Sequence, residues 1–159
     1  MNRIILVGNG FDLAHNLLTS YKNFIEWFWE GYGEKLINST DTYENSIFVN
    51  ANITTSRSYS SWKSYCDKKG CKSILEFTKA LKNDTSIFRY NSKFFESINK
   101  SIESKGWVDI ENEYYKLLVS YTNDESGHSF PEILNAELSI IRALLIEYLE
   151  LVQNQGQSS

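Results

Sequence analysis

Apolar side chains recur every three or four residues over most of this chain, the spacing of one face of a helix. The predicted helices cover residues 21–37, 73–81, 86–104, 107–121 and 133–152. In the first of them Phe24, Trp27, Phe28 and Tyr32 form an aromatic stripe, which we expect to be core rather than a ligand platform. Thr19 or Ser20 is placed to cap that helix.

A different pattern opens the chain. Residues 4–7 are a short apolar run rich in β-branched side chains that ends at Gly8, which is typical of a buried parallel strand. Gly8, Asn9 and Gly10 tolerate positive φ, so we expect a sharp turn with converging N–H groups, and then a helical turn over 11–16. The predicted fold class is therefore α/β and helix-rich.

The strand count is low for such a fold, because only residues 47–49 suggest a second strand. Either further strands are hidden in the polar segment 38–70, or the rest of the sheet lies outside this sequence. We expect that segment to be mainly an irregular connection between better-patterned parts of the chain. It is also the best candidate for a lid. Its lysines are expected to lie in a solvated loop: Lys63, Lys68, Lys69 and Lys72.

The chain has two cysteines, Cys66 and Cys71. A zinc site would need two more ligands, and His15 and His128 are not at ligand spacing. We therefore expect free thiols and no metal.

Composition indicates one domain over residues 1–152 with a polar tail at 153–159, since 159 residues with 42% apolar side chains can bury a core. The net charge is −4 and the sequence has no basic stripe, so nucleic acid is not an expected partner. The apolar runs are too short for a membrane span, and no secretory signal pattern opens the chain. The expected location is the cytoplasm.

The Gly8-x-Gly10 pair alone is a weak signal, because Leu13 stands where a dinucleotide fingerprint has its third glycine. The longer string ILVGNGFDLAHNLLTSYKNFI, residues 5–25, resembles the opening of the AbiH family of bacteriophage abortive-infection proteins. A second match is the W-x-D-I-E element at 107–111, followed by Tyr114. A third is the Leu-Asn-Ala-Glu-Leu run at 134–138, with Tyr148 and Leu149 downstream.

The chain departs from the family pattern at Asn16 and Leu18, where the family usually has Gly and Pro. Family members also continue further, with a strand motif resembling T-F-N-Y-T and a His-Gly element. The resemblance therefore implies that this chain is the N-terminal part of a longer, Rossmann-like domain.

The opening is also similar to sirtuin-like NAD-binding domains, an analogy at the level of the fold. It implies that the amides of the Gly8–Gly10 turn and the following helix N-terminus face a pyrophosphate. The implied cofactor is NAD or a related nucleotide. Its predicted binding residues are Gly8, Asn9, Gly10, Phe11, Asp12 and Glu111.

Asp12 and His15 are the predicted catalytic residues, one helical turn apart, with histidine the natural acid–base near neutral pH. Structural alternatives stay open for each residue. The glycines and Asn9 suit any tight turn, Asp12 suits a helix N-terminus, and His15 can be a packing residue. Asp109 and Glu111 are also ordinary acids for the first turn of a helix.

The resemblance implies a phage-defence function and, if the protein is an enzyme, N-glycosidic attack on a nucleotide such as NAD. We expect no turnover of NAD by this chain alone, because Asp12 and His15 reach only one side of a ligand. The alternative is a non-catalytic helical module that senses a phage-derived trigger or assembles with a partner. An unpaired strand at 4–7 would favour self-association.

Overall fold

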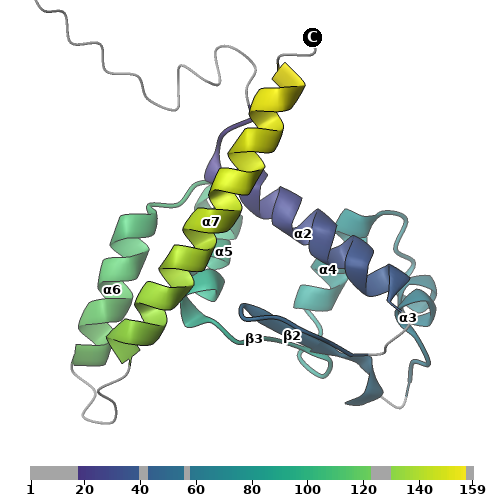
Figure 1. Ribbon diagram of the computed structural model, residues 1–159. Helices are drawn as coiled ribbons and strands as arrows, with labels where there is room; N and C mark the ends of the chain where they lie inside the picture. Colours follow the sequence, from purple (N-terminus) through teal and green to yellow (C-terminus); the bar gives the residue numbers. More distant parts are fainter. Residues whose placement is uncertain (1–17, 40–42, 56–57, 123–129, 157–159) are drawn as a thin grey trace, which may run out of the picture.

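The computed structural model describes residues 18–39, 43–55, 58–122 and 130–156 (Figure 1). These residues form six α-helices, one 3₁₀ turn and three strands. In chain order they are α2 (Tyr21–Asn38), β1 (Tyr43–Asn45), β2 (Val49–Asn52), η1 (Ile53–Thr55), α3 (Trp62–Lys69), α4 (Ile74–Lys82), β3 (Phe88–Tyr90), α5 (Lys93–Lys105), α6 (Ile110–Thr122) and α7 (Phe130–Gly156).

Serines fix where four of the helices begin. In each case the hydroxyl accepts the N–H of the residue three positions on, which satisfies one of the free amides of the first turn. The caps are Ser20 for α2, Ser61 for α3, Ser73 for α4 and Ser92 for α5. Ser20 confirms one of the two predicted caps. Gly70 and Gly106 end α3 and α5 in the left-handed conformation, at φ 70° and 78°.

The predicted parallel strand at 4–7 lies outside the described residues, and the sheet that the structure describes is antiparallel. Its order is β1-β2-β3, and both pairs are antiparallel, with Tyr43 opposite Asn52 and Ala51 opposite Phe88. Two of its strands lie in the polar segment, where the second strand predicted at 47–49 is found shifted to Val49–Asn52 as β2. In β2 Val49 and Ala51 are buried, while Asn50 and Asn52, which alternate with them, are half-buried, so half of this short strand is polar in the sequence. The described residues do not show a Rossmann-like fold.

Two further predictions for the polar segment and its neighbour were wrong. Of the four lysines predicted in a solvated loop, all are exposed as expected and Lys72 is outside a helix, but the other three lie on helix α3, where Trp62 and Tyr65 are buried. The helix predicted over 86–104 begins only at Lys93, because β3 takes Phe88–Tyr90 into the sheet and Ser92 caps α5. The predicted helical spacing of Phe88 was therefore coincidental.

The last two helices keep their predicted identity with shifted ends. Helix α6 begins at Ile110 rather than 107, and α7 extends from Phe130 to Gly156, beyond its predicted bounds at both ends. Part of the predicted polar tail is thus helical.

An aromatic core lies between α2, the sheet and α5. Phe95 is at its centre: its ring centroid is 4.7 Å from those of Phe28 and Phe48, and 6.2 Å from that of Trp29. Phe24 and Tyr32 are buried, and Trp27 and Phe28 pack against the same core. The predicted role of the aromatic stripe in the core is confirmed. Both cysteines are free thiols, as expected.

Helix α2 organises the rest of the packing, since α3, α4, α5 and α7 all contact it. Helix α4 approaches it most closely at Gly33, where an added Cβ would lie 2.7 Å from Cγ2 of Thr78. Helix α7 lies across the molecule and packs on α6 and α2 (Figure 1). Among the described residues no helix is both long enough and apolar enough to cross a membrane.

Candidate functional site

Most of the predicted site residues lie outside the part of the chain that the structure describes. These are Gly8, Asn9, Gly10, Phe11, Asp12 and His15, together with the predicted strand at 4–7. Glu111 is the predicted ligand-binding residue that can be placed. It lies in the first turn of α6 and its side chain is exposed.

The charge of Glu111 acts on the end of the first sequence motif. Tyr21 is the first residue of α2, and its side chain is half-buried. Burial raises the pKa of Tyr21 above its usual value, and the negative charge of Glu111 raises that pKa further. Two motifs that are 90 residues apart in the chain are therefore near enough to influence each other electrostatically.

The C-terminal motif residues reach the same end of the molecule. The Tyr148 hydroxyl on α7 donates a hydrogen bond to the carbonyl oxygen of Leu18, which precedes α2. Figure 1 shows α2 and α6 beginning on the same side of the molecule, beside α7. We call the group Leu18, Tyr21, Glu111 and Tyr148 the motif junction.

Other residues of the second motif have structural explanations or are exposed. Asp109 caps α6, because its Oδ1 accepts the N–H of Asn112 at 3.0 Å. The Trp107 side chain is 61% exposed, and Nζ of Lys105 lies 5.9 Å from its ring centroid. Trp107 is thus available for contact with a ligand or partner.

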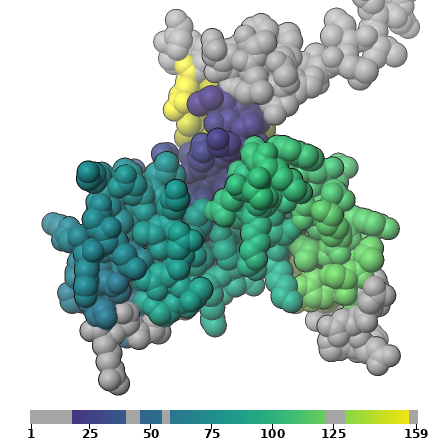
Figure 2. All heavy atoms as spheres, turned by 180° about the vertical axis from the view of Figure 1, so that it is seen from behind, coloured from purple at the N-terminus to yellow at the C-terminus, as the bar shows by residue number. Residues whose placement is uncertain are grey.

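A cavity of about 1090 Å³ lies between α2, α4, β3 and α5, and we call it the α2–α5 cavity. From behind, the molecule is hollowed between the teal atoms of α4 and the green atoms of α5 (Figure 2). Trp29 and Asn99 form a buried polar pair in its wall: Nε1 of Trp29 donates to Oδ1 of Asn99 at 2.7 Å. The Asn99 amide in turn donates to the Phe95 carbonyl at 2.8 Å. Both buried groups are satisfied, so this wall is rigid.

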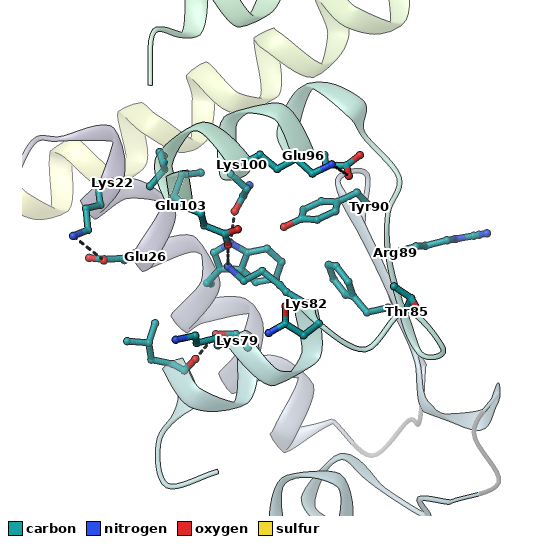
Figure 3. Close-up of a pocket in the computed structure, with 18 of the residues that line it drawn as sticks. Lys22, Glu26, Lys79, Lys82, Thr85, Arg89, Tyr90, Glu96, Lys100 and Glu103 are labelled. Carbon is teal, nitrogen blue, oxygen red and sulfur yellow. Dashed lines mark hydrogen bonds and ion pairs between the residues drawn. The ribbon is translucent and has the colours of Figure 1, made fainter. Parts of the chain in front are cut away.

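Charged side chains ring the α2–α5 cavity (Figure 3). Lys82 pairs with Glu103 at 2.5 Å and also lies over the Trp29 ring, 5.1 Å from its centroid. Burial raises the pKa of Tyr90 well above its usual value, and the charges of Glu103 and Glu96 raise it further. The Tyr90 hydroxyl therefore stays protonated and can donate to a ligand. Sequence reasoning missed this cavity, because its lining comes from four separate elements.

The three sequence motifs fall within one match to a known family. The family model described as "Bacteriophage abortive infection AbiH" matches residues 4–145. The chain belongs to the AbiH family. That family suggests a role in phage abortive infection. No curated protein and no solved structure matches this AbiH chain.

The second and third AbiH motifs also contact each other directly. The Tyr114 hydroxyl on α6 donates to Oδ1 of Asn135 on α7 at 2.6 Å. Two residues on, Glu137 is buried, and its carboxylate accepts a hydrogen bond from the Ser92 hydroxyl at 2.7 Å. Burial raises the pKa of Glu137, and the Ser92 hydrogen bond only partly offsets that rise. These hydrogen bonds connect α5, α6 and α7. A structural role therefore accounts for these motif residues without a ligand.

Proposed function

We propose that this AbiH protein binds a nucleotide such as NAD at the Gly8–Gly10 turn, beside the motif junction, and acts through that site in abortive infection. The observation that carries the proposal is that α2 and α6, which carry the first two motifs, begin on the same side of the molecule, where Tyr148 of α7 binds Leu18. Eight residues separate Gly10 from Leu18, so the turn lies within roughly 28 Å of the junction even with the chain fully extended.

Each group has a role that follows from its chemistry. The amides of Gly8, Asn9 and Gly10, with the following helix N-terminus, bind a pyrophosphate. The exposed Glu111 carboxylate accepts hydrogen bonds from ribose hydroxyls, which is how acidic residues select a ribose in dinucleotide sites. Asp12 and His15 are the acid–base pair for attack on an N-glycosidic bond.

A different class of function also has an observation in its favour. Leu18 of the motif junction and Trp107, which precedes Glu111 by four positions, are 57% and 61% exposed. Exposed apolar groups that gather in one place mark contact surfaces. The alternative is therefore a non-catalytic module that senses a phage component or assembles with a partner through this end.

Thermal unfolding in the presence of NAD or ADP-ribose tests the nucleotide site. At a ligand concentration 100-fold above its Kd, we expect the midpoint to rise by roughly 5–10 °C, because ligand binding stabilises the folded state. Gly10→Val and Glu111→Gln should reduce or abolish the rise. Glu34→Gln, a matched change on the exposed face of α2, should leave it intact.

The absence of a shift with both ligands would contradict the nucleotide site. A full shift in Gly10→Val would also contradict it, since a β-branched side chain there blocks the close approach of a phosphate to the backbone. A specific protein partner found in the same material would then favour the sensing module.

A further inference from the structure

Strand β3 has one edge that no other strand covers among the described residues. The sheet order is β1-β2-β3, so β3 pairs with β2 on one side only. The Asn52 N–H of β2 donates to the Ile87 carbonyl at 2.8 Å. Because backbone groups alternate in direction along an antiparallel strand, those of Arg89 also face β2, and those of Phe88 and Tyr90 face the open edge.

Three backbone groups on this open edge have no hydrogen-bond partner in the part of the chain that the structure describes. The Phe88 N–H is satisfied, since it donates to the Asp84 carbonyl at 3.0 Å. The Phe88 carbonyl and the N–H and carbonyl of Tyr90 are the three that form no such bond. A strand edge with free donors and acceptors is a template for a further strand. What it recognises is therefore an extended polypeptide backbone.

The open edge of β3 borders the α2–α5 cavity. Phe88, Arg89 and Tyr90 all line that cavity. Figure 3 shows the Tyr90 side chain directed into the cavity and the Arg89 side chain directed away from it. Arg89 therefore lines the cavity with its main chain, so the cavity extends along the edge. A strand that paired with β3 would lie at the mouth of the cavity.

The two faces of β3 specify different side chains on such a strand. Side chains opposite Phe88 and Tyr90 would enter the cavity, where Ile25 and Ile102 are buried apolar neighbours. The side chain between them would lie opposite Arg89, which is exposed and forms no ion pair with any described residue. Opposite charges attract at directly facing positions of two strands. The edge therefore suits the order apolar, acidic, apolar.

The charge of the cavity also favours an acidic partner. Its lining has five basic and three acidic side chains, a net charge of +2, in a chain of net charge −4. Each acidic side chain is already paired with a lysine of the same lining. The pairs are Lys22–Glu26 at 4.0 Å, Lys82–Glu103 at 2.5 Å and Lys100–Glu96 at 2.7 Å. Within the described ranges, this leaves the charges of Lys79 and Arg89 unpaired.

We propose that the open edge of β3 binds an extended segment of a partner protein as an added antiparallel strand. An acidic residue of the segment lies opposite Arg89, and the apolar residues on either side of it enter the α2–α5 cavity. Antiparallel pairing is the more stable arrangement, and it lets one residue exchange both hydrogen bonds with Tyr90. A small anion would leave these backbone groups unpaired. The site is separate from the nucleotide turn proposed above.

Fluorescence anisotropy of labelled peptides, titrated with the full chain, tests the backbone pairing. The probe is the fluorescein-labelled peptide Ser-Thr-Val-Glu-Val-Thr-Ser, whose valines take the positions opposite Phe88 and Tyr90. N-methylation of both valines removes the N–H groups that bind the two free carbonyls, so we expect affinity to fall at least tenfold. N-methylation of the glutamate is the matched control. Its N–H points away from β3, so the affinity should change less than about twofold.

A charge swap tests the contact with Arg89. Arg89→Glu should weaken binding of the Val-Glu-Val probe about fivefold and strengthen binding of the matching Val-Lys-Val peptide by a similar factor. Lys63→Glu makes a similar charge change at an exposed position of α3 and should leave both affinities unchanged. Thermal unfolding checks that both variants fold.

Three results would overturn the proposal. They are no binding of the probe at millimolar protein, equal binding of the two N-methylated peptides, and an unchanged preference between the two charged peptides in Arg89→Glu. Self-association of the wild type that Arg89→Glu abolishes, with no peptide bound, would assign the edge to a second copy of this chain instead. None of these outcomes depends on whether NAD binds.

Discussion

Replacing Phe95 by alanine is expected to lower the free energy of unfolding by about 3–5 kcal/mol. Its side chain is fully buried, and its ring packs against those of Phe28, Trp29, Phe48 and Tyr90. Alanine would leave a cavity that stiff aromatic neighbours from α2 and the sheet can fill only in part. A loss of this size is a large share of the 5–15 kcal/mol typical of a domain.

Urea unfolding followed by circular dichroism measures this loss, and Tyr115→Ala is the control. Tyr115 lies on α6 with 63% of its side chain exposed, so its removal should change stability by less than about 0.5 kcal/mol. If Phe95→Ala and Tyr115→Ala had equal effects, the described aromatic core would be wrong.

Two equally buried glutamates should respond in opposite ways to the same substitution. Glu113 accepts hydrogen bonds from Ser97 and from Ser101 at 3.1 Å, and pairs with Lys116 at 3.0 Å. The Ser97 hydrogen bond, followed by Lys116 and Ser101, lowers the pKa of Glu113 against the opposing effect of burial. Glu113→Gln should therefore cost about 1–3 kcal/mol at pH 7, since it weakens bonds to a charged group.

The pH dependence of this loss follows from the lowered pKa. The carboxylate contributes its stability above the unfolded-state pKa of glutamate, and that contribution disappears as the pH falls through the folded-state pKa. Wild type and Glu113→Gln should therefore converge in stability as the pH falls from the unfolded-state pKa of glutamate, about 4.3, through the lower pKa of the folded state. Urea midpoints between pH 3 and pH 7 measure the convergence.

Glu137→Gln is the matched control, because burial raises the pKa of Glu137. Its ionised form is disfavoured in the folded protein, so its contribution to stability falls as the pH rises above the unfolded-state pKa. The side-chain amide oxygen of glutamine can still accept a hydrogen bond from the Ser92 hydroxyl. This substitution should therefore be neutral or stabilising at pH 7. A larger loss in Glu137→Gln than in Glu113→Gln would contradict the assigned environments.

Features encoded by one helix or one stretch of consecutive residues could be predicted from the sequence. Helix α2 was predicted within one residue at its C-terminal end, because its aromatic residues keep a helical period and Ser20 caps it. The motif resemblance also led to the right family, because it rests on consecutive residues in three ordered stretches.

Features that depend on several elements were not predictable. Strand β2 buries only one face and is four residues long, so the alternation at Val49 and Ala51 was too short to place its bounds, which were predicted at 47–49. Phe88 fitted a helical face, yet pairing with β2 outweighed its local preference. The α2–α5 cavity is lined by residues of α2, α4, β3 and α5, which no window of the sequence brings together.

The central claim is that a nucleotide binds where the first two AbiH motifs meet. The most direct measurement is an ¹H–¹⁵N NMR titration of the full chain with ADP-ribose, read at the backbone amides of Ser20, Tyr21, Ile110 and Glu111. The account predicts saturable shifts at these amides, with those lining the α2–α5 cavity, such as Asn83 and Thr85, unmoved. Shifts confined to the cavity, or no shift at millimolar ADP-ribose, would contradict it.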